Sequence, residues 1–215
     1  MTPVIFWGAT GQAKVLNEAL SSTDASLVAL FDNRKISSPF EGVPIYYGET
    51  GFNDWIEMSN GASPALACVA IGGRYGRDRL HRAQWLSARG YAPLTVVHSR
   101  AFVAGDSLIG EGCQILALAA VCAGARLGAS VIVNTKASID HDCVIGDGVH
   151  IAPGATIAGQ VHISDFAFIG AGAVVLPNLH IGAGATVGAG AVVTRDVAPG
   201  DTVLGNPARL YQTHG

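Results

Sequence analysis

The chain has 215 residues, a formal net charge of −3, 28 glycines and only 13% charged residues. This balance provides no basic surface for nucleic acid or an anionic membrane, so we expect neither as a partner. No charged leader with an apolar segment stands at residues 1–11. The four cysteines lack the paired spacing of a metal or redox motif, which predicts a reduced, cytoplasmic protein with no bound metal.

Strand and helix signals alternate over residues 1–96. Apolar stretches predict strands at 3–7, 27–31, 65–71 and 94–97, and helical patterns cover 13–20 and 77–89. The weakly patterned connection 39–51 has room for one short strand. On the second helix we expect Arg77, Arg79, His81, Arg82 and Arg89 to form a solvated basic face. The alternation predicts a small Rossmann-like α/β domain with a parallel sheet.

Glycine-rich or polar segments follow three of these strands. They are Gly8-Ala9-Thr10-Gly11-Gln12, Asp32-Asn33-Arg34 and Gly72-Gly73-Arg74. A glycine turn before a helix can bind an anion, and polar groups at the next strand end can hold a ribose or base; plain turns and loops use the same residues. Because the ends of parallel strands meet at one edge, we expect the three segments to converge on a nucleotide diphosphate. The chain is too short for the two halves of a dinucleotide site.

From residue 97 to residue 198 an aliphatic residue recurs at every sixth position. The seventeen positions are Val97, Val103, Ile109, Ile115, Val121, Leu127, Val133, Ile139, Ile145, Ile151, Ile157, Ile163, Ile169, Val175, Ile181, Val187 and Val193. A small or aliphatic residue follows four positions later, and turn-forming residues dominate the position directly after the aliphatic one, where we expect the sharp turn. This period predicts a solenoid with three short strands and 18 residues in each coil.

The hexad pattern resembles that of the hexapeptide-repeat acyltransferases. The resemblance implies that residues 97–198 form a left-handed parallel β-helix. The spacing alone does not fix the hand, and the usual crossover rule would favour the opposite one. Residues 199–215 break the period and are expected to form an extended tail.

One corner of the predicted solenoid carries an unusual side chain. His141 stands between Asp140 and Asp142, and Gly159 follows eighteen residues later. With 18 residues in a coil, His141 and Gly159 should lie in one column on adjacent coils. An imidazole beside a carboxylate suits a general base, and the glycine can present an uncovered N–H to an oxyanion. A surface histidine without a function is the alternative.

Four motifs are informative together. They are Gly8-Ala9-Thr10-Gly11, Ala70-Ile71-Gly72, Ile139-Asp140-His141-Asp142-Cys143 and Gly205-Asn206-Pro207-Ala208. Over nearly the whole chain they are similar to the nucleotide-amino-sugar N-acetyltransferases of the sialic-acid O-acetyltransferase-like family. The resemblance implies a homotrimer with active sites between subunits and acetyl transfer from acetyl-CoA to the 4-amino group of a nucleotide-linked dideoxy sugar. GDP-perosamine is the favoured substrate, and a UDP-linked amino sugar is the alternative.

The resemblance also implies residue roles. His141 would be the general base, Asp142 or, as the alternative, Asp140 would tune it, and Gly159 N–H would face the oxyanion. Predicted substrate contacts are Gly8, Thr10, Gly11, Gln12, Asp32, Asn33, Gly72, Gly73 and Arg74, and predicted CoA contacts are His150, Ala171, Ala189, Pro207 and Arg209. The family often has His at the position of Gln12 and a polar pair at the position of Gly73-Arg74. These differences leave the identity of the nucleotide base and of the sugar undecided.

Three other functions compete with this one. A sugar O-acetyltransferase would use His141 equally well. A γ-class carbonic anhydrase needs clustered histidines for zinc, and His162 and His180 are eighteen apart but in a different column from His141. A non-catalytic scaffold would leave Asp140-His141-Asp142 unexplained. We expect direct transfer without an acyl-enzyme, because a thioester is already activated and Cys143 is at an inward-facing position.

Overall fold

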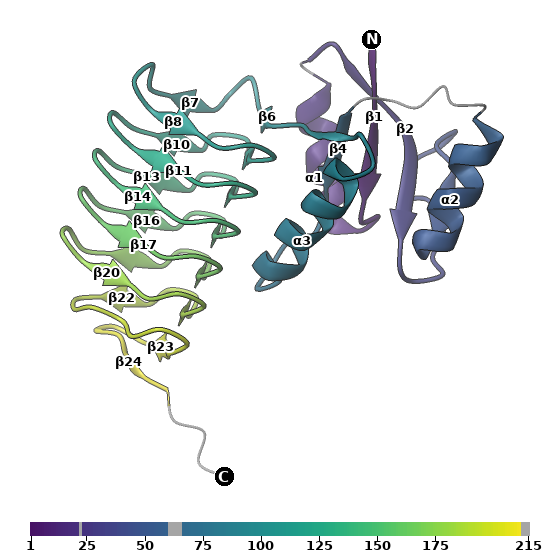
Figure 1. Cartoon of the computed structure of the whole chain (residues 1–215). Helices are drawn as coiled ribbons and strands as arrows, with labels where there is room; N and C mark the ends of the chain where they lie inside the picture. Colours follow the sequence, from purple (N-terminus) through teal and green to yellow (C-terminus); the bar gives the residue numbers. More distant parts are fainter. Residues whose placement is uncertain (22, 60–65, 212–215) are drawn as a thin grey trace.

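The computed structural model describes residues 1–21, 23–59 and 66–211, and it has two parts that lie side by side (Figure 1). A small α/β unit contains the first five strands and all three helices found in the described residues, and a column of stacked coils follows it. Ala65, the first residue of one predicted strand, lies outside the described residues. The predicted division at residues 96/97 and 198/199 stays a prediction.

The α/β unit is built on a parallel sheet with strand order β3-β2-β1-β4-β5. Its strands are β1 (Thr2–Trp7), β2 (Ala25–Asp32), β3 (Ile45–Tyr47), β4 (Leu66–Val69) and β5 (Ala92–Pro93). Alternate residues of β1 point to opposite faces: Val4 and Phe6 pack with helix α1 (Gly11–Leu20), and Ile5 and Trp7 pack with helices α2 (Gly48–Met58) and α3 (Gly76–Ser87). Both faces of the sheet are therefore buried, as is usual for parallel strands.

Helix α2 was not predicted from the sequence. Its eleven residues include Gly48 and Gly51, which disfavour a helix, and only Phe52 and Trp55 are buried. These two rings pack against Phe31, with ring centroids 5.1 and 5.5 Å from it. Contact with aromatic residues of the sheet thus stabilises a helix that local preference does not indicate.

The coils form a three-sided parallel β-helix. The docking face comprises β6 (Val96–Val97), β9 (Gln114–Ile115), β12 (Ile132–Val133), β15 (His150–Ile151), β18 (Phe168–Ile169), β21 (Thr186–Val187) and β23 (Thr202–Leu204). The second face comprises β7 (Phe102–Val103), β10 (Ala120–Val121), β13 (Ser138–Ile139), β16 (Thr156–Ile157), β19 (Val174–Val175) and β22 (Val192–Val193). The third face comprises β8 (Leu108–Ile109), β11 (Arg126–Leu127), β14 (Val144–Ile145), β17 (His162–Ile163) and β20 (His180–Ile181).

The pairing register confirms the predicted coil length. Ser138 pairs with Thr156 and Ile139 with Ile157, so equivalent residues of adjacent coils are 18 positions apart. The hexad aliphatics from Ile115 to Val193 are buried in one continuous core. At the end of the column, Thr186 pairs with Thr202 in β23, and the strand β24 (Arg209–Leu210) pairs with β23 in the antiparallel sense.

The turns differ from the prediction in one respect. From Ile109 to Val187 the left-handed residue is the third after the aliphatic position, as at Asp142 (φ 58°) and Gly148 (φ 64°), and not the residue directly after it. Glycines directly after the aliphatic position are there for a steric reason and not for a left-handed backbone. A Cβ on Gly128 would lie 2.9 Å from Asp147 N, so these glycines allow adjacent coils to approach closely.

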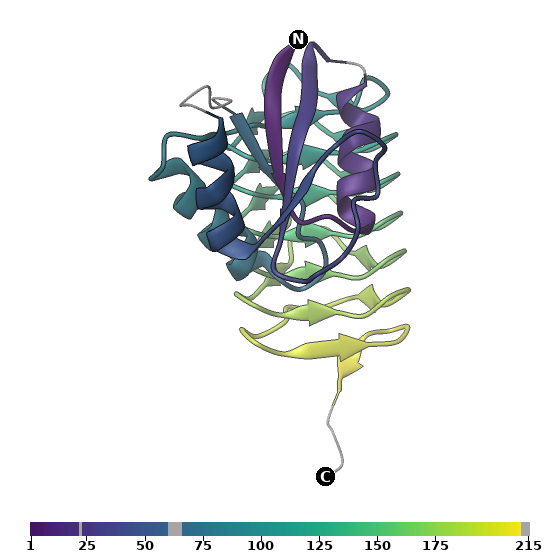
Figure 2. The same cartoon turned by 90° about the vertical axis from the view of Figure 1, so that its right-hand side faces the viewer.

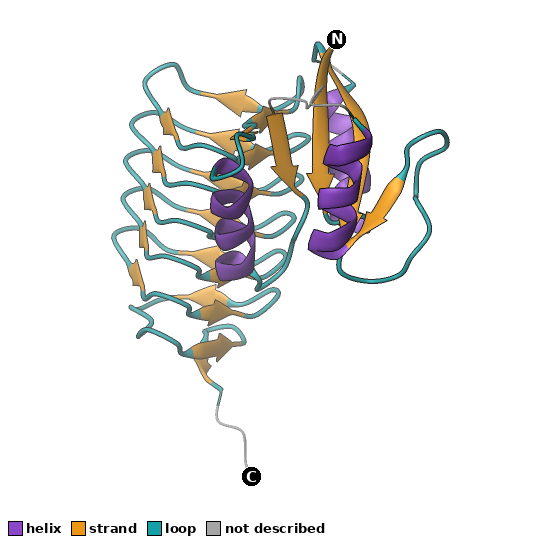
Figure 3. Cartoon of the chain, turned by 45° about the vertical axis from the view of Figure 1, so that its right-hand side comes forward, coloured by secondary structure: helices purple, strands orange, loops and turns teal. Residues whose placement is uncertain are grey.

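The α/β unit packs against the docking face with contacts from the α1 side of the sheet and from α3 on its other side (Figure 2). Leu116 and Ile132 from the β-helix join the same apolar cluster as Val4 and Phe6. Helix α3 lies along the coils at the corner between the third face and the docking face (Figure 3). The predicted solvated basic face on this helix is wrong for Arg79, which is fully buried against the β-helix.

Candidate active site

His141 lies at the corner between the second and third faces, in the turn that joins β13 to β14. Its Nδ1 is 2.9 Å from Oδ2 of Asp142, and its side chain is 55% exposed. Asp142 has a left-handed backbone, a conformation that Asp tolerates better than most residues, and in this turn its carboxylate meets the neighbouring ring. A carboxylate at Nδ1 favours the tautomer whose Nε2 is free to accept a proton.

Asp140 has a different partner from Asp142. Its Oδ1 accepts the backbone N–H of His141 at 2.7 Å, so it holds the turn. Of the two candidates for tuning the base, Asp142 is the one in contact with the imidazole.

The imidazole lies directly over Gly159 on the next coil. A Cβ on Gly159 would be 2.5 Å from His141 Nε2 and 2.7 Å from Cε1, so only glycine leaves room for the ring. Gly159 N–H has no acceptor among the described residues, whereas its carbonyl accepts the N–H of Asn178 at 3.2 Å. The corner therefore combines a base with an unpaired peptide donor.

The electrostatics of this corner favour proton uptake. The hydrogen bond that His141 Nδ1–H donates to Asp142 raises the pKa of His141 above its ordinary value of 6.5, and the charges of Asp140 and Asp142 act in the same direction. A base with a raised pKa is a stronger proton acceptor, provided that the pH keeps it neutral.

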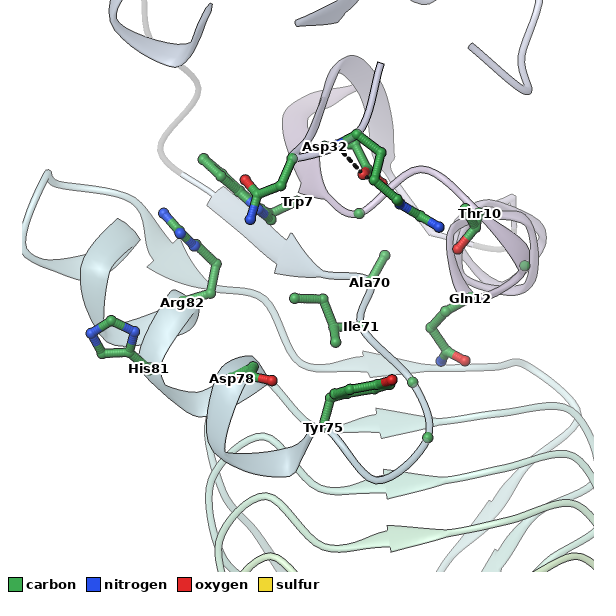
Figure 4. A pocket seen from close by; sticks show the side chains of 16 residues that line it. Trp7, Thr10, Gln12, Asp32, Ala70, Ile71, Tyr75, Asp78, His81 and Arg82 are labelled. Carbon is green, nitrogen blue, oxygen red and sulfur yellow. Dashed lines mark hydrogen bonds and ion pairs between the residues drawn. The ribbon is translucent and has the colours of Figure 1, made fainter. Parts of the chain in front are cut away.

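A cavity of about 770 Å³ lies at the strand ends of the α/β unit (Figure 4). Nine residues of the three predicted segments line it: Gly8, Thr10, Gly11, Gln12, Asp32, Asn33, Arg34, Gly72 and Gly73. The sheet thus brings these segments together. Arg74, also predicted as a substrate contact, is not among the lining residues.

Two of the lining residues shape the cavity. Gly8 has φ 105°, and a Cβ there would lie 2.4 Å from the carbonyl oxygen of Ala70, so the close approach of the chain just after β1 and β4 requires glycine. Asp32 is buried, and its carboxylate accepts the N–H of Ala9 at 3.0 Å and that of Arg34 at 2.9 Å. These bonds and the Arg34 guanidinium lower the pKa of Asp32 even though its burial raises it.

Helix α1 leaves its N-terminus open to the cavity. Thr10 is the N-cap residue and makes no side-chain capping bond, and no acidic residue stands in the first turn. A helix N-terminus with free N–H groups attracts an anion.

Helix α3 supplies a wall of the cavity that the sequence did not reveal. Tyr75, Asp78, His81 and Arg82 all line the cavity, and the last three are on the side away from Thr10 and Gln12 (Figure 4). The spacing 75, 78 and 82 puts three of them on one face of the helix, a signal that becomes meaningful only once α3 is placed beside the strand ends. Arg82 is held over the ring of Trp7 at 3.9 Å and bonds Glu49 at 2.8 Å.

The predicted CoA contacts lie apart from one another in a single chain. His150 is on the docking face, 5% exposed, with Nδ1 3.2 Å from the carbonyl of Gly73 and Nε2 3.1 Å from Asn134 Nδ2. Ala171 and Ala189 stack at the corner between the docking and second faces, where Gly190 N–H donates to Ala171 O at 2.8 Å. Pro207 and Arg209 are exposed near the end of the column. Their contact with CoA stays a prediction.

The cavity and His141 are on opposite sides of the β-helix. The cavity belongs to the α/β unit on the docking face. His141 is in the turn between β13 and β14, two strands that lie on the side of the coils away from the α/β unit (Figure 1). Within one chain, a ligand in this cavity does not reach His141.

The arrangement of His, Cys, Asp and Glu side chains bears on the carbonic anhydrase alternative, which needs clustered zinc ligands. Across residues 1–21, 23–59 and 66–211, no three His, Cys, Asp or Glu side chains are grouped so that they could hold a metal ion. The rings of His162 and His180 stack at 5.5 Å on the third face.

Comparisons with known proteins agree with the fold and the repeat. The family described as bacterial transferase hexapeptide (six repeats) matches residues 124–159 and 160–195. The solved acetyltransferase domain of PglB from Neisseria gonorrhoeae FA1090 is 31% identical, with a TM-score of 0.85 over 98% of this chain and 100% of that one. The chain belongs to the hexapeptide-repeat transferases, and the predicted α/β domain followed by a left-handed parallel β-helix is confirmed.

Within this family the chain is similar to GDP-perosamine N-acetyltransferases. The enzyme of that name from Escherichia coli O157:H7 is 42% identical over 95 residues, which are 44% of this chain and 42% of that protein. PerB from Caulobacter crescentus, solved in complex with CoA and GDP-perosamine, is 31% identical with a TM-score of 0.89, covering 98% of this chain and 97% of that one. No helix in the described part of the chain is both long and apolar enough to span a membrane.

Proposed function

We propose that this protein transfers the acetyl group of acetyl-CoA to the 4-amino group of a nucleotide-linked dideoxy sugar, with GDP-perosamine as the first substrate to test. The observation that carries the proposal is the corner at His141, where a carboxylate-tuned imidazole and an unpaired peptide N–H share one place on a hexapeptide coil. The similarity to PerB over almost the whole chain supports the choice of donor and acceptor.

In the proposed reaction the sugar amine attacks the thioester carbonyl. His141 Nε2 takes a proton from the nitrogen, the C–N bond forms, and the C–S bond breaks as the carbonyl is restored. The departing thiolate takes up the proton that the imidazole holds. Asp142 stabilises the imidazolium, and Gly159 N–H donates to the oxyanion of the tetrahedral intermediate.

Three of the four cysteines are buried and poorly suited to form an acyl-enzyme, and for the partly exposed Cys122 burial and the charge of Asp140 raise the pKa. Cys143 is buried, its thiol donates to Ala158 O at 3.1 Å, and burial raises its pKa. Burial also raises the pKa of Cys68 to about 12 and that of Cys113 to about 11. A thiol that stays protonated is a weak nucleophile, which favours direct transfer in a ternary complex.

The nucleotide would bind in the cavity of the α/β unit. Its diphosphate fits the open N-terminus of α1 beside Thr10, because the first turn of this helix holds no acidic residue. The sugar would extend toward Gln12 and Gly72, which lie next to the β-helix: Gln12 Nε2 donates to Gln114 Oε1 at 2.6 Å.

We infer a homotrimer with active sites between subunits, because the nucleotide cavity and the base His141 lie on opposite sides of a single chain. Since the cavity and His141 are on opposite sides of one β-helix, a complete site needs the cavity of one chain and His141 of the next. A closed ring of three such contacts would give every chain one complete site.

The test of the activity is a screen of GDP- and UDP-linked 4-amino sugars with acetyl-CoA, followed by thiol release. We expect turnover with GDP-perosamine and a product whose acetyl group survives mild base, as an amide does. A base-labile product would make the protein an O-acetyltransferase, and absence of thiol release with every amino sugar would contradict the proposal. Acetyl-cysteine formed in stoichiometric amount from acetyl-CoA alone would contradict direct transfer.

The shared site can be tested with two inactive variants. His141→Asn removes the base, and Gly11→Asp puts a carboxylate at the α1 N-terminus, where a Cβ meets nothing within 4 Å. Coexpressed at equal levels, the two should regain about one quarter of native activity, because random trimers pair an intact cavity with an intact His141 at that frequency. No recovery would contradict the shared site, and Gly11→Asn controls for the added side chain.

A further inference from the structure

Arg79 is a buried cation that the proposed reaction does not use. It comes from α3, its side chain is 0% exposed, and it is the largest of the fully buried side chains. No carboxylate forms an ion pair with it among the described residues. Burial lowers its pKa to about 10, so it stays charged at neutral pH.

The guanidinium binds carbonyl groups of three separate segments. Nη1 donates to Ile71 O at 2.9 Å, Nε donates to Ser130 O at 2.8 Å, and Nη2 donates to Gly148 O at 2.7 Å and Val149 O at 3.3 Å. An apolar side chain would fill such a seam without the cost of burying a charge. The planar fork of arginine instead fixes the relative positions of the groups it binds, which suggests a role beyond adhesion.

One of these segments is a wall of the nucleotide cavity. Ile71, Gly72 and Gly73 all line it. Arg79 holds the start of this wall at Ile71 O, and His150 holds its end at Gly73 O, 3.2 Å from Nδ1. Both ends of the wall are therefore bound to residues 148–150 of the β-helix, directly or through Arg79.

The backbones make the same connection. A Cβ on Gly76, the first residue of α3, would lie 2.2 Å from Gly148 O, and one on Gly148 would lie 2.8 Å from Gly76 O. The helix and the coil thus touch without intervening side chains, so the height of α3 along the column is closely set.

Residues 148–150 belong to the same coil as His141, because this coil spans the 18 positions 138–155 and the next begins at Thr156, which pairs with Ser138. In a ring of parallel β-helices, equal residues of neighbouring chains lie at equal height along the symmetry axis. We propose that Arg79 is a positioning residue that sets the cavity wall at the height of His141 in the neighbouring chain. This inference rests on the proposed function and its shared site.

The experiment compares Arg79→Lys and Arg79→Met with the native chain. Binding of GDP and of CoA is measured by calorimetry, and kcat is measured with GDP-perosamine and acetyl-CoA. We expect both ligands to bind within about threefold of native, because each half of the site keeps its own contacts. We expect kcat to fall by about 10- to 100-fold, because a shift of about 1 Å between reacting groups has an effect of that size.

Arg77→Met is the matched control. Arg77 is on the same helix and lies over the ring of Phe166 at 4.4 Å, so it contacts the β-helix without touching the cavity wall. Its kcat should stay within about twofold of native. An equal fall in kcat for Arg77→Met would overturn the proposal, since any weakening of the docked helix would then suffice.

Two results for Arg79 itself would also overturn the proposal. A lower melting temperature with native kcat would mean that Arg79 only stabilises the fold, and loss of GDP binding would mean that it shapes the cavity alone. If Arg79→Met does not fold, Arg79→Lys and Gly76→Ala decide in the same assay. A native chain that transfers no acetyl group would refute the proposed function, whereas an active native chain with an equally active Arg79→Lys would refute only the positioning role.

Discussion

Two histidines on one coil have opposite surroundings. His141 is exposed at the corner far from the α/β unit, where Asp142 raises its pKa, whereas His150 is buried on the docking face, where desolvation lowers its pKa to about 4. Arg79 adds to the lowering, because its positive charge disfavours a second cation. The same side chain is thus prepared to accept a proton on one side of the β-helix and kept neutral on the other.

The partners of His150 define its neutral form. Gly73 O can only accept, so Nδ1 carries the proton, and Asn134 Nδ2 can donate to Nε2. A protonated His150 would lose the bond from Asn134. The comparison indicates that His141 serves chemistry and His150 serves the contact between the two parts, and four changes test it.

The largest effect should come from His141→Asn. Without the base we expect kcat to fall by about 10² to 10⁴, since general-base assistance has that size. Steady-state kinetics with saturating substrates measures it, and CoA binding serves as the control for folding. A kcat within threefold of native would show that His141 is not the base.

Gly159→Ala should have the next largest effect. The added methyl group would occupy the place of the imidazole, 2.5 Å from Nε2, and push the ring away. We expect kcat to fall by about 10- to 100-fold through this displacement. Gly105→Ala is the control on the same β-helix, because a Cβ there meets nothing within 4 Å. Native kcat in Gly159→Ala would contradict the observed stacking of the ring on Gly159.

Asp142→Asn should change the pH dependence more than the fold. Asn tolerates the left-handed backbone at this position, but it removes the carboxylate that raises the pKa of His141. The acidic limb of the pH–rate profile should therefore move to lower pH, and the plateau rate should fall by about tenfold as the base weakens.

The control for this prediction is Asp140→Asn. Its amide oxygen can still accept the His141 N–H, and Asp140 acts on the ring only through its charge. We expect a smaller shift in the same direction. An unmoved acidic limb in Asp142→Asn would show that the limb does not report His141.

Protonation of His150 should have the smallest effect on catalysis at neutral pH. It should instead lower the stability of the folded protein at acidic pH. Unfolded histidine binds a proton near pH 6.5, but folded His150 resists protonation until about pH 4. Stability is therefore complete above pH 6.5 and is lost as the pH falls through this window, by up to about 3 kcal/mol from this residue.

Urea unfolding at pH 7.5 and pH 4.5 measures this loss. His150→Asn can still donate to Gly73 O but does not titrate, so the difference between the two pH values should shrink. His162→Asn, at an exposed position on the third face, should leave the difference unchanged. Equal pH dependence in native protein and His150→Asn would contradict the buried neutral state.

The sequence by itself determined the β-helix and the contents of its reactive corner. The hexad period sets the coil length, and the coil length brings His141 over Gly159, because a repeat turns separation along the chain into separation in space. The three strand ends could be placed at one cavity for a similar reason, since parallel strands end at one edge of a sheet. These features follow from local periodicity and hydrogen-bond register.

Only the tertiary structure decided how the two parts face each other. Helix α2 depends on aromatic contacts with the sheet, the α3 wall of the cavity depends on where the helix packs, and the burial of Arg79 and His150 depends on the docked seam. Arg79 is buried, and not solvated, only because the two parts exclude water where they meet. The surfaces that do this come from segments about 50 to 80 positions apart in the chain. No local pattern records which surfaces will meet.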